Sequence, residues 1–416
     1  MPRRARSLVC LVLVFALSAR AEELRGTGTL AFRSYFLQRT YSVSAANKSW
    51  AAGGFLELNT DWWHDLRGDV AVFTAQKIAG RWDQDGANLL RTGQHENTVL
   101  GLACLQVRKS RTTLSLYRQR LYDPFLEAGE NEENKMVPYL MEAVSIRSEE
   151  IPHLSLTASY INGVLDEYMP TYEAPSVVAG YPGVRRPVQL AGAAWTPNDR
   201  LALQLWDYDM PDFMNLVFAQ GDATVWHRDS FSVTGTLQWI RQRSRGDALA
   251  GYMRTGVSSA QVSLDWDAGL SLIAAVSRTQ RQNDLWTEWG GYPGFTSMRR
   301  WDNDRAGERA LVVGGSYDFA AAGIPGLTLS LYSSWSSMPT DVEVPQPGTR
   351  EQNLKIEYAG HGALENWTFT FKGAQVQQNA DLGGEDCDDV RLIVHYRLPF
   401  SWPKRGLASL SSSVME

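Results

Sequence analysis

The sequence predicts an all-β protein, a transmembrane antiparallel β-barrel of 18 strands with short periplasmic turns and long extracellular loops. Three observations lead to this prediction. Apolar and polar residues alternate with period two along most of the chain, the connections between these stretches alternate between short and long, and an export signal begins the chain. Without such an export signal, the same alternation would fit any half-buried sheet.

The export signal occupies residues 1–21. Arg3, Arg4 and Arg6 form a basic start, Leu8 to Leu17 is an apolar stretch too short to span a bilayer, and Ala19-Arg20-Ala21 resembles a cleavage site. We therefore expect three parts, which are a signal peptide at 1–21, a barrel at 22–402 and a disordered tail at 403–416. Loss of the four signal-peptide arginines lowers the formal charge from −6 to about −10, which disfavours nucleic acid as a partner.

The alternating stretches predict the strands. They lie at about 27–38, 52–64, 67–77, 95–108, 111–120, 140–149, 153–161, 188–196, 199–208, 229–242, 245–255, 258–267, 269–280, 306–320, 325–336, 350–361, 365–378 and 385–399. The long connections between them are predicted at 39–51, 78–94, 121–139, 162–187, 209–228, 281–305, 337–349 and 379–384. Only the link near Thr255 to Val257 breaks the long-short rule. A soluble sandwich has no reason to keep its long loops at one end, so this rule favours a membrane barrel.

The faces of the strands are assigned from the closing strand, Asp389 to Pro399. Val390, Leu392, Val394 and Tyr396 fall on one face, while Arg391 and His395 fall on the other. Because a cation facing lipid near the bilayer midplane costs about 2–4 kcal/mol, the polar face is expected to line the lumen. The candidate pore-lining residues are Arg33, Lys77, Lys355, Glu357, Lys372 and Arg391. The alternative for each is that it only pairs with a neighbour and solvates the wall.

The connection 121–139 combines acidic residues with apolar ones. Tyr122 and Phe125 could anchor it to the barrel wall, while Asp123, Glu127 and Glu130 would meet water. These five residues are the candidates for a loop that folds into the lumen and constricts it. A solvated extracellular loop is the alternative.

Other chemistry has weaker support. The six histidines lack metal-ligand spacing, and no hydrolase, zinc-protease or nucleotide-binding motif is present. The acidic group Asp207, Asp209 and Asp212 could bind calcium, although a solvated loop rim explains it as well. We expect no catalytic residues, no metal, no cofactor and no enzymatic activity. The two cysteines that remain after cleavage, Cys104 and Cys387, lie far apart in sequence and are not expected to pair.

Aromatic residues are abundant, with 15 Trp and 16 Tyr, and many lie near strand ends. Aromatic girdles at the two membrane interfaces would produce this placement. A soluble exported β-rich glycan-binding protein or hydrolase is also rich in tryptophan, so that class stays open at this point.

Several segments resemble the OprD-type outer-membrane porins. Arg33 lies in L-A-F-R-S-Y-F-L-Q-R, which resembles the first strand of that family, and Asp389 to Tyr396 resembles its closing strand. The segment Glu308 to Gly326 resembles the family's Y-D-F…G-I-P-G pattern, and Glu351 to Tyr358 resembles part of its penultimate hairpin. The chain departs from the family in the fourteen residues that follow Trp402, where family members commonly end on an aromatic or apolar residue.

The resemblance implies an 18-stranded monomeric barrel with an inward basic ladder and constricting loops, with a trimer as the alternative assembly. It implies passive, selective diffusion of amino acids, peptides or carboxylates across the Gram-negative outer membrane. The expected partners are small anionic or zwitterionic solutes, outer-membrane lipid and lipopolysaccharide. A barrel that exports an acidic polysaccharide remains the alternative function within the membrane class.

Overall fold

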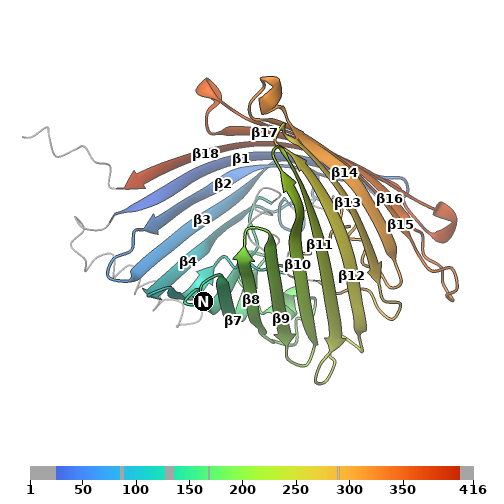
Figure 1. Cartoon of the computed structure of the whole chain (residues 1–416), viewed down its shortest axis with the longest axis horizontal. Coiled ribbons are helices and arrows are strands. Elements are labelled where there is room, and N and C mark those ends of the chain that lie inside the picture. Colours follow the sequence, from blue (N-terminus) through green and yellow to red (C-terminus); the bar gives the residue numbers. More distant parts are fainter. Residues whose placement is uncertain are drawn as a thin grey trace, which may run out of the picture.

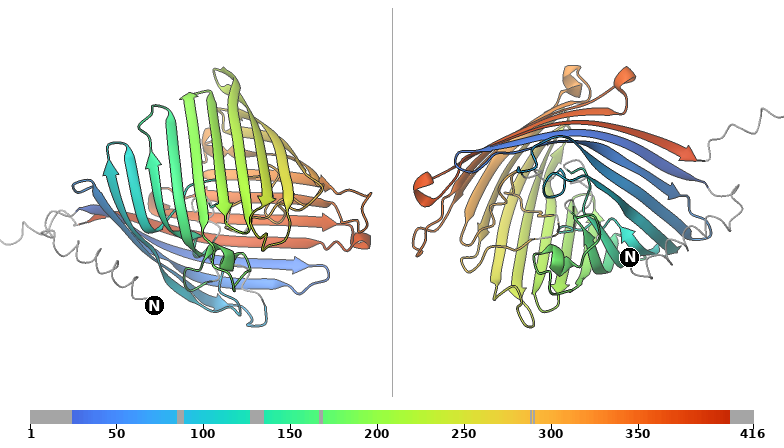
Figure 2. Two further views of the ribbon diagram at one scale, coloured as in Figure 1. Left: turned by 90° about the horizontal axis from the view of Figure 1, so that it is seen from below. Right: turned by 180° about the vertical axis from the view of Figure 1, so that it is seen from behind.

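The computed structural model describes residues 25–84, 89–126, 135–166, 169–287, 289 and 291–402. These residues form one antiparallel sheet of 18 strands in which every strand pairs with its neighbours in the sequence, and β1 also pairs with β18. The sheet is thereby closed into a barrel, as predicted. Figure 1 shows β18 (red) lying directly beside β1 (blue), and Figure 2 shows the ring of strands from two further sides.

The strands follow one another along the chain with few interruptions. They are β1 (Gly26–Tyr41), β2 (Asn47–Thr60), β3 (Leu66–Ala79), β4 (Asn97–Lys109), β5 (Thr112–Gln119), β6 (Leu140–Ser148), β7 (Leu154–Leu165), β8 (Val188–Asn198), β9 (Leu201–Met210), β10 (Met214–Arg228), β11 (Phe231–Ser244), β12 (Arg254–Trp266), β13 (Leu270–Thr279), β14 (Arg309–Asp318), β15 (Leu327–Ser337), β16 (Thr349–Ala359), β17 (Trp367–Gln378) and β18 (Cys387–Trp402). The short helical elements α2 (Pro175–Val178), η2 (Phe319–Ala322), η3 (Gly362–Leu364) and η4 (Ala380–Leu382) lie in connections. Among the described residues, no helix is both long and apolar enough to cross a membrane.

The predicted strand count of 18 is correct, but two of the predicted assignments are wrong. The supposed long loop 209–228 contains β10, and the supposed strand 245–255 is mostly a connection, because β11 ends at Ser244 and β12 begins at Arg254. The missed strand has a physical cause. Near its start, β10 buries Met214, Leu216 and Phe218 on its inner face against loops, so the expected polar inner face is absent there.

The exception to the alternation of short and long connections does not lie where the sequence predicts it. The predicted short link near Thr255 lies within β12. The short connections on the long-loop side are instead 211–213, between β9 and β10, and 42–46, between β1 and β2, where the sequence predicts a long connection over 39–51. The remaining long connections all leave from the same end of the barrel, which agrees with the expected division into long extracellular loops and short periplasmic turns.

The two faces of the wall follow the predicted pattern. On the outer face, Leu237 is 68% exposed and Leu331 is 55% exposed, and Leu205, Val276 and Leu392 are exposed in the same way. On the inner face, Arg391 is 8% exposed and Lys372 is 7% exposed, because loops and neighbouring side chains cover them. The exposed outer face is therefore apolar, as a lipid-facing surface requires.

Two hydrophobic clusters lie inside the barrel instead of in a central core. One joins β6 to β12 with parts of the loops 120–139 and 280–308, which we call L3 and L7. The other joins β1 to β4, β18 and the long-loop ends of β6 and β7 with Leu89 and Leu90 of the loop 80–96 and with Met136 and Val137 of L3. The view from behind in Figure 2 shows loop segments within the ring of strands. The interior is thus filled from the long-loop end by loops that pack against its wall.

Close packing of strands near the closure point makes one glycine important. Gly54 on β2 lies opposite Phe32 on β1 and has φ of 151°, and a Cβ atom added there would lie 1.9 Å from the carbonyl oxygen of Ala31. We expect Gly54→Ala to destabilise the barrel by about 1–3 kcal/mol, because either the strand spacing or the backbone must change. Urea unfolding in detergent micelles, monitored by heat-modifiable gel mobility, measures this loss. Gly235→Ala on β11 is the matched control, since no heavy atom lies within 4 Å of its added Cβ, and equal midpoints for the two variants would contradict the prediction.

Candidate functional site

Three cations stand side by side on the inner wall of neighbouring strands. Lys355 on β16 is the register partner of Lys372 on β17, and Lys372 is in turn the partner of Arg391 on β18. Period-two alternation alone puts each of them on the inner face, and the register places them in one row. We call these three residues the basic row. Like charges directly opposite each other on a sheet repel, so the row favours an anion in front of it.

Carboxylates on the same wall offset part of this charge. The Lys355 Nζ lies 2.9 Å from Glu357, whose carboxylate also accepts a hydrogen bond from the Thr370 hydroxyl at 3.2 Å. Asp389 accepts two hydrogen bonds from the Arg391 guanidinium, at 2.7 and 3.0 Å, and one from Arg39 at 2.8 Å. One carboxylate is therefore shared between two arginines, and among the described residues this wall keeps a positive balance.

Loop L7 brings further cations to this wall. Arg299 donates hydrogen bonds to the carbonyl oxygens of Leu354 and Gly373, and the Arg300 guanidinium donates one to the Tyr41 hydroxyl at 3.2 Å. Burial, with Arg391 close by, lowers the pKa of Arg299 to about 10, so it still carries its charge at neutral pH. The long connection that seemed to be only a loop thus supplies charge to the inner wall.

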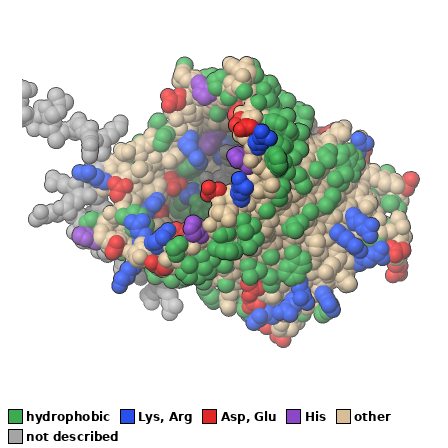
Figure 3. Space-filling model, viewed as in Figure 1, with side chains coloured by type: hydrophobic (Ala, Val, Ile, Leu, Met, Phe, Trp, Pro, Cys, Tyr) green, Lys and Arg blue, Asp and Glu red, His purple; other side chains and the backbone are tan. Residues whose placement is uncertain are grey.

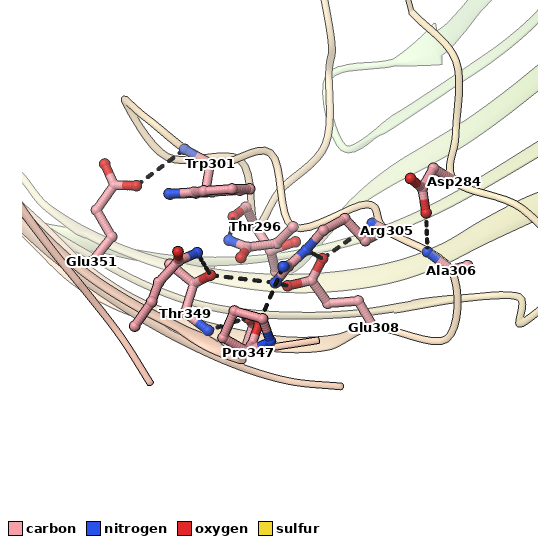
Figure 4. Close-up of polar contacts among 12 residues, drawn as sticks. Asp284, Thr296, Trp301, Arg305, Ala306, Glu308, Pro347, Thr349 and Glu351 are labelled. Carbon is pink, nitrogen blue, oxygen red and sulfur yellow. Dashed lines mark hydrogen bonds and ion pairs between the residues drawn. The ribbon is translucent and has the colours of Figure 1, made fainter. Parts of the chain in front are cut away.

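L7 is held against the wall by a network of polar contacts, drawn in Figure 4. Buried Glu351 of β16 accepts hydrogen bonds from the backbone N–H groups of Arg300 and Trp301, at 3.0 and 3.1 Å. Arg305 donates to Glu308 at 2.7 and 3.1 Å and to the Pro347 carbonyl oxygen at 3.1 Å. These bonds join L7 to β16 and to the connection before it, so Arg299 and Arg300 have fixed positions.

Loop L3 contacts two opposite parts of the wall. Phe125 packs edge-on against Tyr208 of β9 and Phe218 of β10, with ring centroids 5.3 and 5.7 Å apart. Met136, at the other end of the loop, packs in the cluster formed with β1 to β4 and β18. Since β1 and β10 are nine strands apart in a ring of 18, the two described ends of L3 lie against distant parts of the wall. Figure 3 shows a hollow in this face of the molecule, with charged and histidine side chains around it.

The sequence of this chain matches the model of the OprD family, described as outer membrane porins, over residues 26–400. The chain belongs to the OprD family of outer-membrane porins. No curated protein sequence matches it at a significant level. The resemblance stated from its sequence segments is thereby confirmed, and the soluble alternatives no longer apply.

Solved structures of similar fold come from Pseudomonas. OccK9 (OpdG) of Pseudomonas aeruginosa superimposes with a TM-score of 0.82 at 20% identity, covering 91% of this chain and 99% of that one. OpdK of the same organism, in a structure with vanillate, gives 0.80 at 18% identity with the same coverage. A BenF-like porin from Pseudomonas fluorescens Pf-5 gives 0.79 at 19% identity, also covering 91% and 99%. At such identities the likeness concerns the fold of this OprD-family porin.

The predicted pore-lining residues of the porin do not form one group. Lys355, Glu357, Lys372 and Arg391 lie together on β16 to β18. Lys77 is exposed and lies on the inner face of β3, opposite Ala51, which is three strands from β18 and away from the basic row.

Arg33 is inward, as predicted, but it is covered. Its guanidinium donates a hydrogen bond to the carbonyl oxygen of Lys135 in L3, and the residue is 6% exposed. A cavity of about 10 Å³ lies beside it, lined also by Phe55, Met136 and His395, which is roughly room for one water molecule. Arg33 therefore holds the returning end of L3 against β1.

The five candidate residues in L3 also lie in different surroundings. Phe125 is buried and packs against Tyr208 and Phe218, whereas Tyr122 is 65% exposed. Asp123 is buried instead of facing water, because its Oδ1 accepts hydrogen bonds from the N–H groups of Phe125 and Leu126 and from the Tyr208 hydroxyl. Glu127 and Glu130 lie outside the described residues.

A second charged group lies on β5 and was missed by sequence reasoning. The Arg120 guanidinium, just after β5, lies 2.8 Å from Glu57 of β2, and Arg118 lies 3.6 Å from Glu142 of β6 and over the ring of Tyr172. Within β5, alternation alone would have pointed Arg118 outward, but Tyr117 has a positive φ of 79°, which breaks the alternation there. Only the structure reveals this irregularity.

The remaining sequence candidates have ordinary partners. Asp207 accepts a hydrogen bond from Asn215, Asp209 pairs with Arg245, and Asp212 pairs with Arg186. Within the described part of the chain, no group of three or more His, Cys, Asp or Glu residues could hold a metal ion. Cys104 and Cys387 are both buried and free.

We expect Asp304 in L7 to make the conductance of the porin depend on pH. Burial, and then the nearby carboxylates of Asp302 and Glu308, raises the pKa of Asp304 to about 8. A carboxyl group whose pKa is raised on folding stabilises the folded loop at low pH, and that contribution is lost as pH rises from about 4 to about 8. We expect more frequent open-channel current fluctuations at pH 8.5 than at pH 5.5, and Asp304→Asn should give the low-pH behaviour at both. Asp247→Asn, an exposed carboxylate in the neighbouring loop 245–253, is the control, and an identical pH response in wild type and Asp304→Asn would refute the assignment.

Proposed function

We propose that this porin is a narrow channel for passive diffusion of small carboxylate-bearing solutes, and that its signal peptide directs it to the Gram-negative outer membrane. The observation that carries the proposal is the basic row, in which Lys355, Lys372 and Arg391 are register neighbours on one inner wall. In a lumen with low-dielectric walls, such a row attracts anions and raises their local concentration. Arg299 and Arg300 of L7 extend the same attraction toward the long-loop end.

Exposure suggests where a solute would touch the row. The side chain of Lys355 is 31% exposed and that of Glu357 is 27% exposed, whereas the Arg391 side chain is 9% exposed. A passing carboxylate would thus displace Glu357 as the partner of the Lys355 ammonium. The more deeply buried Lys372 and Arg391 would attract it electrostatically without direct contact. Binding of this kind is weak and quickly reversed, as conduction requires.

The inserted loops support selectivity for small solutes. One described end of L3 packs against β9 and β10 and the other against β1, and L7 covers part of the inner wall of β16 and β17. Loop residues packed inside the ring of strands disfavour the alternative of acidic polysaccharide export, because a polymer needs a continuous wide path. Aromatic carboxylates are the favoured solute class, since the similar barrel OpdK was solved with vanillate. Zwitterionic amino acids are the second class, and Glu57 or Glu142 would meet their amino group.

Liposome swelling tests the proposal. After subtraction of the rate in protein-free liposomes, purified folded protein should pass vanillate and benzoate faster than vanillin or benzyl alcohol, which have similar size and no carboxylate, by about tenfold. Raising the salt concentration should reduce this preference, because the attraction is electrostatic. Equal rates for charged and uncharged solutes would refute a selective carboxylate path, and the absence of any swelling or conductance would refute the channel function.

A further inference from the structure

Arginines also gather on the outer face of the barrel, but only at the long-loop end of β11 to β16. Each lies within the last four residues of its strand on that side, points outward by alternation and is exposed. They are Arg241 and Arg243 of β11, Arg254 of β12, Arg278 of β13, Arg309 of β14 and Arg350 of β16. We call these six residues the outer arginine belt. Figure 3 shows Lys and Arg side chains at the lower and right margins of this face, where Figure 1 places these strand ends.

The belt sets like charges directly opposite each other. Arg243 is the register partner of Arg254, and Arg278 is the register partner of Arg309. Opposed like charges destabilise a sheet, and within the described residues none of the six belt arginines has an Asp or Glu oxygen within 4.0 Å. The outward positions of β11 to β16 themselves carry no carboxylate. Other arginines of this rim are paired, since Arg245 contacts Asp209 and Arg281 contacts Asp341.

The position of the belt relative to the apolar surface identifies its surroundings. Outward Trp239 and Trp335 lie within about a residue pair of the belt, and the Arg350 guanidinium lies over the Trp335 ring at 5.9 Å. Farther along the same strands the outward residues are apolar, with Leu237, Val276 and Leu311 all exposed. Arginines just beyond an aromatic girdle lie at the level of lipid headgroups, and the long-loop end faces the outer leaflet.

We propose that the outer arginine belt binds the phosphate groups of lipid A, the membrane anchor of lipopolysaccharide in the outer leaflet. Lipid A carries two phosphates on a disaccharide, and arginine forks bind phosphate oxygens in pairs. A phosphate between Arg243 and Arg254, and a second between Arg278 and Arg309, would compensate both opposed pairs. The belt thus gives the barrel a preferred lipid-contacting side, from β11 to β16.

The chemistry favours lipid A over ordinary phospholipid. A single phosphodiester carries one negative charge, whereas two phosphate monoesters on one molecule carry more charge and can reach two arginine pairs together. Phosphatidylglycerol is therefore the competing occupant in the test.

Native mass spectrometry of the folded protein in detergent tests the proposal, with lipid A, enzymatically dephosphorylated lipid A and phosphatidylglycerol as three separate probes. We expect wild type to retain lipid A at least about tenfold better than either other lipid. The double variants Arg243→Gln/Arg254→Gln and Arg278→Gln/Arg309→Gln should each weaken lipid A retention by about tenfold. Arg243→Lys/Arg254→Lys keeps the charge but removes the guanidinium forks, so its retention of lipid A should lie between those of wild type and the glutamine variant.

Arg228→Gln is the matched control, because Arg228 is exposed at the opposite end of β10 beside Asp229, and it should leave retention unchanged. Unaltered retention in both double variants, or equal retention of phosphatidylglycerol, would overturn the proposal. Heat-modifiable mobility and single-channel conductance should match wild type in every variant, which separates this result from the solute path. If a glutamine variant does not fold, the lysine variant and the comparison of three lipids on wild type still decide the outcome.

Discussion

Replacing Lys355 with glutamate is expected to reverse the charge preference of the channel. The substitution changes the local charge by two units, places a second carboxylate beside Glu357, and takes away the most exposed cation of the basic row. The variant should still fold, because the new carboxylate faces Lys372 across the register. We expect vanillate flux to fall by about tenfold or more, and the reversal potential in a salt gradient to shift toward cation selectivity.

Two variants control this experiment. Lys355→Arg keeps the charge and should keep the anion preference, while Lys109→Glu makes the same charge change at the exposed end of β4, outside the lumen. If Lys109→Glu altered the reversal potential as strongly as Lys355→Glu, net charge and not the basic row would set selectivity. An unchanged reversal potential in Lys355→Glu would remove that residue from the solute path.

Substituting Asp123 with alanine is expected to widen the channel. Its Oδ1 accepts the Tyr208 hydroxyl at 2.7 Å and the N–H groups of Phe125 and Leu126 at 3.2 and 3.0 Å, so one atom fixes the start of L3 to β9. Loss of this acceptor leaves buried donors unsatisfied, at a cost of about 2–4 kcal/mol to the folded position of the loop. Single-channel conductance should rise by about twofold or more, with a weaker distinction between vanillate and larger solutes.

The contribution of each bond can be separated. Asp123→Asn keeps an oxygen acceptor and should retain most of the constriction, whereas Tyr208→Phe removes one of the three bonds and should show an intermediate effect. A conductance that is unchanged in Asp123→Ala would mean that the packing of Phe125 and Leu126, both 3% exposed or less, holds the loop by itself.

The barrel could be predicted from the sequence because its wall obeys simple chemistry. Lipid requires apolar residues on one face of each strand, and a wet interior tolerates charges on the other. The sequence alone therefore assigns Val390 and Leu392 to the lipid face and Arg391 to the lumen face. The assignment of faces from polarity fails where loops, and not water, cover the inner face of a strand. The start of β10 buries Met214, Leu216 and Phe218 against L3 and L7, and its inner face then resembles its outer one.

The candidate site could be predicted only in part for a similar reason. Alternation gives the direction in which Lys355, Lys372 and Arg391 point, but the register that sets them side by side depends on pairings between three strands. The roles of Arg33 and Asp123 depend on where a loop returns, which local patterns do not encode. Arg299 and Arg300 follow one another in a loop rich in aromatic residues, and their sequence offers no period to indicate an inward position.

Closure of the ring places a constraint on the order of assembly. β1 and β18 pair over sixteen register positions, and Arg39 reaches Asp389 across this junction at 2.8 Å, although the two residues are 350 positions apart in the chain. The charged wall of the solute path is therefore shared by the first and last strands. Because pairings between such distant segments form slowly, we expect this wall to become complete only in the last step of folding. A barrel that stalls before that step would have an open edge and an incomplete filter, so selective conduction reports on finished assembly.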